Sequence, residues 1–299
     1  MKRKWIIGTR GSKLALKQTD MVMEQLKSFH PDLEFITKII KTTGDIMLDK
    51  PLQSIGDKGF FVKEIEDDLL SGGIDLAVHS MKDLPGDLAP GLVVGAALKR
   101  EDPRDAFVSF NLSRFDRVAK GSKIGTNSLR RKSQILNLNP GVVIIPIRGN
   151  IDTRISKIET LGLDGAILAL AGMKRMGFES LVKDILSLDM MVPSSGQGAI
   201  CVETRDEKVL IDLLRPIDDP ETRKVVTIER KVQNMMGGGC SVPLGINAAV
   251  TDGVLTLRIA YGDEDGVRLA RVKESGSQVE ADEIVRRAVE KATAGFKDS

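Results

Sequence analysis

A group of polar side chains follows a short apolar segment near residue 80 of this 299-residue chain. Apolar residues alternate with period 2 over residues 74–78, which predicts a strand. A polar turn follows this strand, and Pro85 ends the turn. Between them stand Ser80, Lys82 and Asp83. Open α/β sheets keep their sites at the carboxyl ends of strands, so a carboxylate and an ammonium group here are candidates for catalysis. The plain alternative is a strand exit with solvated polar residues.

Arginine occurs at the ends of three further predicted strands. Guanidinium groups bind carboxylate or phosphate through paired hydrogen bonds, and the first turn of a helix adds backbone N–H donors. One such junction means little, because helix starts are polar in any case, but three in succession predict an anion site. The side chains concerned are Thr126, Ser128, Arg130 and Arg131 at the first junction, Arg148, Gly149 and Arg154 at the second, and Arg175 at the third. Arg10 and Ser12 form a similar but weaker signal, at a glycine turn that caps the first helix.

The second cysteine of the chain lies on an unusually bare stretch of backbone. Three glycines precede Cys240. Because glycine loses more conformational entropy on folding than other residues, their presence indicates a structural need such as a tight turn or the close approach of a bulky group. An exposed thiol there would be a nucleophile, a redox site or an attachment point, and no CxxC partner supports redox work. The first cysteine, Cys201, stands between Ile200 and Val202 and is predicted to be part of the core.

Composition narrows the classes of function. A net charge of +2 and only 4% aromatic residues argue against a nucleic-acid-binding surface. No apolar run approaches the roughly 18 residues that a membrane span needs, and the basic start lacks the apolar region of an export signal. Two cysteines then predict reduced thiols and a cytoplasmic location. The two histidines and two cysteines lack zinc-ligand spacing, so we expect no metal.

Patterning predicts an α/β fold with two successive series of strands and helices. Hinges are expected near residues 101–104 and 194–196, because Pro103 and a Ser-Ser-Gly run interrupt the pattern. The predicted divisions are 1–100 with 197–216 as one lobe, 101–196 as a second lobe, and 217–299 as a small α+β domain. In its last helix, Ile284, Ala288 and Ala292 form the predicted buried row.

Taken together, these motifs closely resemble those of the porphobilinogen deaminase (hydroxymethylbilane synthase) family. The most specific string is HSMKDLP at residues 79–85. The ordered set extends nearly end to end, with GTRGS at 8–12, GDKGFF at 56–61, GTNSLRR at 125–131, RGN at 148–150, GQG at 196–198 and GGC at 238–240. One departure is Gly237, which stands where members commonly carry Glu, and another is Ser54, where some carry a second lysine.

The resemblance implies a fold and an activity. Two doubly wound lobes would resemble type II periplasmic binding proteins, and the small C-terminal α+β domain would carry the cofactor. The cofactor implied is dipyrromethane, bound to Cys240 through a thioether. Four porphobilinogens would be condensed head to tail with loss of ammonia, and hydrolysis would release hydroxymethylbilane for uroporphyrinogen-III synthase. The enzyme would be a monomer. The alternative is a non-enzymatic protein on the same two-lobed fold that binds an anionic solute.

The resemblance also implies roles for individual residues. Asp83 would hold the pyrrole N–H and stabilise the cationic azafulvene that forms when ammonia leaves. Because each porphobilinogen carries an acetate and a propionate, the growing chain needs many cations and neutral donors. The positions that match this role are Arg10, Ser12, Lys58, Ser80, Lys82, Thr126, Ser128, Arg130, Arg131, Arg148, Gly149, Arg154, Arg175 and Gln197.

Overall fold

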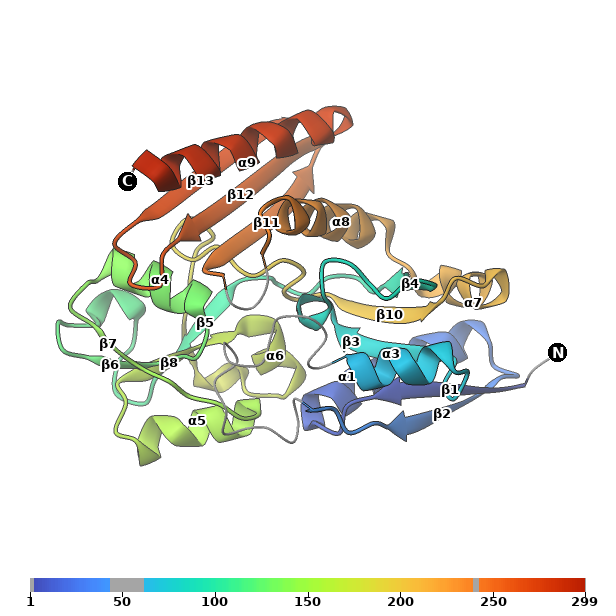
Figure 1. The fold of residues 1–299 in the computed structure, drawn as a ribbon. Coiled ribbons are helices and arrows are strands. Elements are labelled where there is room, and N and C mark those ends of the chain that lie inside the picture. The colour runs from blue at the N-terminus through green and yellow to red at the C-terminus, as the bar shows by residue number, and fades with distance from the viewer. Residues whose placement is uncertain (1–2, 44–61, 239–241, 299) are drawn as a thin grey trace. The chain divides into compact units, whose positions relative to one another are not determined.

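The structure, a computed structural model, describes residues 3–43, 62–238 and 242–298. The chain divides into two compact units, Met1–Glu101 with Ala199–Lys224 and Asp102–Gly198 with Val225–Ser299. The described residues form three sheets, two of five strands and one of three (Figure 1). This arrangement confirms the mixed α/β class and the small C-terminal α+β part. The three-domain division at the stated boundaries stays a prediction.

The first unit is built on the sheet β2-β1-β3-β10-β4. β1 pairs in parallel with β2 and β3, whereas β10 runs antiparallel between β3 and β4. The late strand β10 returns from residue 200 into the middle of this sheet, so two segments far apart in the sequence build the first unit. The elements of this unit are β1 (Lys4–Thr9), α1 (Lys13–Phe29), β2 (Glu34–Ile39), α3 (Lys63–Leu70), β3 (Leu76–Ser80), β4 (Leu92–Ala97), β10 (Ile200–Arg205) and α7 (Lys208–Leu214).

Alternation along the strands divides the core of the first unit into two layers. On one face, α1 and α7 cover side chains such as Ile7, Val78 and Val202. On the other face, Ile65 and Leu69 of α3 cover Ala77 and its neighbours. Successive strand residues point to opposite faces, so consecutive residues of β3 contact different helices. This determines which helix each polar residue at the end of β3 meets.

The second unit contains the sheet β7-β6-β8-β5-β9. Three parallel strands are again followed by an antiparallel one, because β6 pairs in parallel with β7 and β8 while β5 runs antiparallel to β8 and β9. The α4 residue Ile135 packs on one face, and α5 and α6 cover the other. The elements are β5 (Asp105–Val108), β6 (Lys123–Gly125), α4 (Leu129–Leu138), β7 (Val143–Ile145), α5 (Ile151–Thr160), β8 (Gly165–Ala169), α6 (Leu170–Arg175) and β9 (Val182–Ile185).

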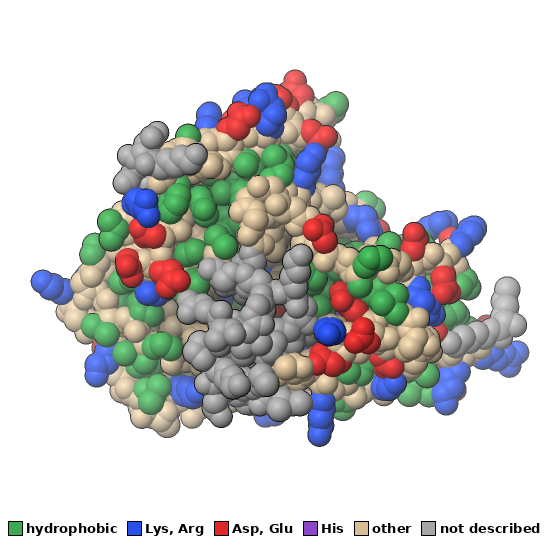
Figure 2. All heavy atoms as spheres, in the orientation of Figure 1, with side chains coloured by type: hydrophobic (Ala, Val, Ile, Leu, Met, Phe, Trp, Pro, Cys, Tyr) green, Lys and Arg blue, Asp and Glu red, His purple; other side chains and the backbone are tan. Residues whose placement is uncertain are grey.

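The C-terminal part is an antiparallel meander with helices on one face. Strands β11 (Leu244–Thr251), β12 (Val254–Gly262) and β13 (Leu269–Ser277) pair in sequence order, and α8 (Pro220–Met235) and α9 (Ala281–Asp298) pack against them. Ile284, Ala288 and Ala292 are fully buried, as predicted. The exposed side of α9 carries intermixed charges (Figure 2), among them the ion pairs of Arg286 with Glu283 and Glu290.

Most predicted elements are present, but three were missed. Ser12 caps α1 and Cys201 is buried in β10, both as expected, and Ser128 caps α4. The sequence reading left out α6, α7 and β9, which are short and lack a clear period. None of the helices among the described residues has the length and apolarity to span a membrane.

Candidate functional site

Asp83 lies on a rigid turn at the carboxyl end of β3. A short 3₁₀ turn covers Met81–Asp83, and the buried side chains of Met81 and Leu84 hold it against the core. The backbone N–H of Met81 donates to the carbonyl of Ala199 at 3.0 Å, which ties the turn to the segment that enters β10. The Asp83 side chain is exposed and makes no hydrogen bond or ion pair with any described residue. Its carboxylate is therefore available to a ligand.

One polar residue of α1, Gln18, contacts the end of the same strand. Ser80 Oγ accepts a hydrogen bond from Gln18 Nε2 at 2.9 Å and donates one to Gln18 Oε1 at 3.1 Å. Ser12 Oγ accepts from the backbone N–H of Ala15 and begins the helix. Gln18, which is 2% exposed, was missed by the sequence reading, because a polar residue inside a helix normally indicates the solvated face. The signal that could have found it is its place beside Thr19 on the predicted inner stripe.

Arg10 and Lys82 occupy the positions expected for cations near this strand end. Arg10 follows β1 directly and precedes the Ser12 cap, and Lys82 is the central residue of the turn before Asp83. Both side chains are partly buried.

In the second unit, Arg130 and Arg131 bind one buried carboxylate. Asp105, the first residue of β5, is fully buried, and each of the two arginines is 5% exposed. Arg130 Nη1 donates to Asp105 Oδ2 at 2.8 Å and Arg131 Nη2 donates to Asp105 Oδ1 at 2.7 Å. Arg130 Nη1 also donates to the carbonyl of Val192 at 2.8 Å. The two arginines therefore link β5 and α4, and Arg130 also links them to the segment of residues 192–198, which we call the strap.

The charges of this cluster do not balance. Burial alone would raise the pKa of Asp105, but the charges of Arg130 and Arg131 outweigh it and hold that pKa far below its usual value. Burial lowers the pKa of the Arg130 guanidinium, against the attraction of Asp105. With an ionised carboxylate and two guanidinium groups, the cluster carries one surplus positive charge. A buried surplus charge of this kind suits an anionic ligand.

Gln197 joins this cluster from the strap. Its Nε2 donates to Asp105 Oδ1 at 2.9 Å and to the carbonyl of Pro103 at 2.7 Å. The next residue back, Gly196, donates its N–H to the buried carboxylate of Glu229 in α8 at 2.6 Å. The structure thus brings Gln197 to the carboxylate that Arg130 and Arg131 bind, although it lies more than 60 residues from either arginine in the sequence.

The remaining predicted residues of the second unit lie at strand ends, as expected. Thr126 is buried after β6, and its Oγ1 accepts from the N–H of Ser128. Ser128 caps α4 through the N–H of Arg131.

The second and third junctions are positioned by the backbone around them. Gly149 has φ +109, where a Cβ would also meet Thr153, so glycine is required in this turn. Arg154 Nε donates to the carbonyl of Gly149 at 2.8 Å, and Arg148 stands just before it. Arg175 ends α6 and donates from Nη2 to the carbonyl of Gly198 at 2.6 Å.

Two of the predicted site residues, Lys58 and Cys240, lie outside the described residues. The glycines before Cys240 have local reasons for their type. Gly237 has φ +60 just after α8, the left-handed conformation that ends many helices. At Gly238 a Cβ would lie 2.5 Å from Leu244 Cδ2, so a side chain there would require the Leu244 side chain to move.

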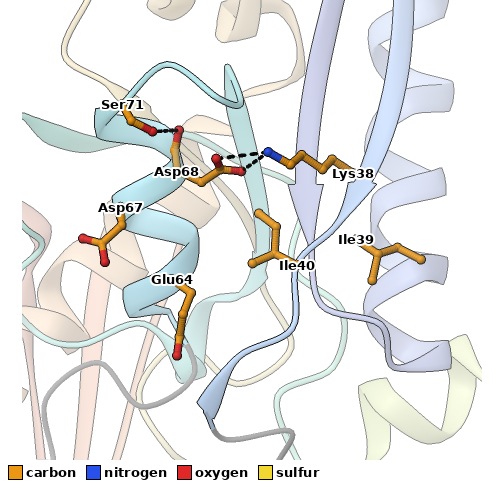
Figure 3. A pocket seen from close by; sticks show the side chains of 7 residues that line it. All are labelled: Lys38, Ile39, Ile40, Glu64, Asp67, Asp68 and Ser71. Carbon is orange, nitrogen blue, oxygen red and sulfur yellow. Dashed lines mark hydrogen bonds and ion pairs between the residues drawn. The ribbon is translucent and has the colours of Figure 1, made fainter.

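A separate groove of about 570 Å³ lies between the end of β2 and α3. Figure 3 shows Lys38 paired with Asp68, at 2.7 Å between Nζ and Oδ2, with Asp67 and Glu64 on the same helix. Three carboxylates against one ammonium group make this lining acidic. The groove is therefore unsuited to the anion that the arginine clusters favour.

Some solved structures have weak likeness to the chain. A putative methionine-binding lipoprotein from Bacillus subtilis matches with a TM-score of 0.45 and 8% identity, over 74% of this chain and 92% of that one. A nutrient binding protein from Burkholderia cenocepacia bound to methionine matches with a TM-score of 0.46 and 11% identity, over 74% and 94%.

Sequence comparison gives much stronger matches. The model of the porphobilinogen deaminase dipyromethane cofactor binding domain matches residues 5–212, and the model of the porphobilinogen deaminase C-terminal domain matches residues 224–294. The porphobilinogen deaminase of Syntrophus aciditrophicus is 42% identical over 97% of this chain and 95% of its own. That of Carboxydothermus hydrogenoformans is 44% identical over 95% and 92%. The chain therefore belongs to the porphobilinogen deaminase family.

Proposed function

We propose that the chain is a hydroxymethylbilane synthase, a transferase that condenses four porphobilinogens head to tail with loss of ammonia and releases hydroxymethylbilane by hydrolysis. The observation that carries this proposal is the exposed Asp83 carboxylate, unpaired among the described residues, on a turn that buried side chains hold in place. Family membership supplies the reaction, and this geometry supplies a group suited to it.

Asp83 would stabilise the positive charge that develops on porphobilinogen as ammonia leaves. A carboxylate aimed at developing charge lowers the barrier most when it needs no reorganisation, which the packed turn favours. Its oxygens can accept the pyrrole N–H and hold a proton during transfer. Lys82 on the same turn would bind a substrate carboxylate as a point charge.

The arginines of the second unit would bind the acetate and propionate groups. Arg130 and Arg131 carry one charge more than Asp105 neutralises, so a ligand carboxylate would complete the balance. Arg148, Arg154 and Arg175 at the following junctions would add cations for a polyanion. Thr126, Ser128 and Gln197 would contribute neutral donors.

The residues of the chain fit the dipyrromethane cofactor that the family model names. The support is the surplus buried charge at Arg130 and Arg131, which an acidic pyrrole group would neutralise. When bound, dipyrromethane supplies the free pyrrole end to which the units are joined. We propose that Cys240 holds it through a thioether, because this cysteine completes the Gly-Gly-Cys string at residues 238–240 that the chain shares with the family.

The proposal is tested by measuring porphobilinogen consumption, ammonia release and bilane formation together. Wild type should release one ammonia for each porphobilinogen consumed, and Asp83→Asn should lose at least about 10²-fold in turnover. Asp87→Asn is the matched control, a second exposed carboxylate beyond Pro85, and it should keep wild-type turnover. Near-normal turnover in Asp83→Asn would sink the assigned role, and binding without ammonia release would favour a solute-binding protein.

Three further features belong to this proposal. We infer a monomer, a cytoplasmic location suited to reduced thiols, and delivery of the bilane to uroporphyrinogen-III synthase. Sedimentation analysis tests the first, cell fractionation tests the second, and a coupled assay with that synthase tests the third.

A further inference from the structure

His79 of β3, Glu203 of β10 and Glu66 of α3 form a polar cluster between the first sheet and α3. His79 Nε2 and Glu203 Oε2 lie 3.1 Å apart, and the two side chains are 3% and 0% exposed. In the β3–β10 register, Cys201 is opposite His79 and Glu203 is opposite Ala77. Directly opposite residues share a face, so both side chains lie on the face that α3 covers. This cluster plays no part in the roles assigned above.

A second carboxylate faces the pair from α3. Burial raises the pKa of the Glu66 carboxyl, and the charge of Glu203 raises it further. The titratable groups around His79 are thus Glu203 and the thiol of Cys201 on β10, and Glu66 on α3, with Asp67 as the next charge along that helix.

The cluster is costly for the fold. Glu203 Oε1 and Glu66 Oε1 are buried without a hydrogen-bond partner among the described residues, and His79 Nε2 and Glu203 Oε2 approach to 3.1 Å without forming a hydrogen bond. Their surroundings are apolar, with Ile65, Leu69 and Ala77 in the same layer. Well-packed hydrophobic residues in place of a buried ion pair are often neutral or stabilising, so stability alone does not account for these side chains.

The position of the cluster suggests what it does. His79 is the penultimate residue of β3, and the Met81–Asp83 turn follows directly after Ser80. The carbonyl oxygen of His79 also accepts a hydrogen bond from the Cys201 thiol, with 3.7 Å between sulfur and oxygen. Strand β10 therefore contacts both the side chain and the backbone of His79. The 3.1 Å approach of His79 Nε2 to Glu203 Oε2 requires one spacing and one register of β3 against β10, so these two side chains affect where the end of β3 lies. A catalytic carboxylate must be held to within about 0.5 Å.

We propose that His79 and Glu203 are positioning residues that set the placement of the turn bearing Lys82 and Asp83. This inference rests on the proposed role of Asp83. The pair does not contact substrate, and it acts through the backbone of β3.

The test replaces the pair by apolar residues of similar size in the holoenzyme, as His79→Leu with Glu203→Leu. We expect a melting temperature equal to or above that of wild type, a kcat at least about 10-fold lower and a KM within about 3-fold. Thr204→Val is the matched control. It removes another buried polar group from β10, where Thr204 Oγ1 donates to the carbonyl of Asp75 at the far end of β3. It should change stability and leave kcat unchanged.

Glu203→Gln provides a second variant should the double replacement fail to fold. It keeps the size of the side chain and removes one charge, so the acidic limb of the kcat–pH profile should shift, whereas Thr204→Val should leave that limb in place. A folded variant with wild-type kcat and an unshifted profile would overturn the inference.

Combination with Asp83→Asn separates this inference from the proposed function. If the pair acts through Asp83, its replacement should cause little further loss in the Asp83→Asn background. Full additivity of the two losses would overturn the positioning role and leave that of Asp83 intact. Wild-type turnover in Asp83→Asn alone would instead overturn the role of Asp83.

Discussion

Replacing Asp105 by Asn removes the charge that two buried guanidinium groups share. Arg130 and Arg131 donate to its oxygens at 2.8 and 2.7 Å, and none of the three residues is more than 5% exposed. Breaking a buried ion pair by removing one partner costs about 3–5 kcal/mol, because the remaining charge stays desolvated. At about 2 °C per kcal/mol for a chain of this size, the melting temperature should fall by about 6–10 °C.

Thermal and urea denaturation of the holoenzyme measure this loss. Asp116→Asn is the matched control, because Asp116 pairs with Arg114 at 3.1 Å while both side chains are more than half exposed. Exposed pairs contribute about 0–1 kcal/mol, so this variant should melt within about 2 °C of wild type. A fall of less than about 2 °C in Asp105→Asn would refute the reasoning.

The stability difference between wild type and Asp105→Asn should also depend on pH in a specific direction. The pKa of Asp105 is far below its usual value, so its contribution to stability is complete above about pH 4 and is lost only as the pH falls through the folded-state value. The difference in stability between wild type and Asp105→Asn should therefore be constant from pH 5 to 8 and shrink in strong acid.

Three other substitutions give sharp expectations. Ser12→Ala removes the cap that accepts from the N–H of Ala15 and should cost about 1 kcal/mol in urea denaturation, and no loss would contradict the cap. Glu66→Gln should raise the melting temperature near pH 7 and have little effect below about pH 4, because a raised folded-state pKa destabilises the fold only at pH values where the unfolded chain has lost that proton. An equal effect at both pH values would contradict that reasoning. Ile284→Ala should lower the free energy of unfolding by about 2–5 kcal/mol, because this side chain of α9 is fully buried against the three-stranded sheet. A loss below about 1 kcal/mol would argue against that packing.

Local signals in the sequence predicted the elements that local chemistry determines. The glycine turn ending in Ser12 predicted the cap of α1, and the spacing of Ile284, Ala288 and Ala292 predicted the buried face of α9. The same signals predicted that polar residues would follow β3.

Pairings between distant residues could not be predicted in this way. Strand β10 enters its sheet more than 100 residues after β3, and no periodicity encodes that partner. The arginines of α4 were expected to bind ligand, and nothing nearby in sequence indicated that Asp105 would take a hydrogen bond from each. His79 and Glu203 likewise meet across two strands.

The most direct test of the account is the intact mass of freshly purified, denatured protein beside that of its Cys240→Ser variant. We predict a wild-type mass that exceeds the sequence mass by two linked pyrrole units, and no such excess in the variant. If the wild-type mass is that of the bare chain, porphobilinogen is added and the measurement is repeated. A mass that still shows no adduct would contradict assembly on a cofactor held by Cys240.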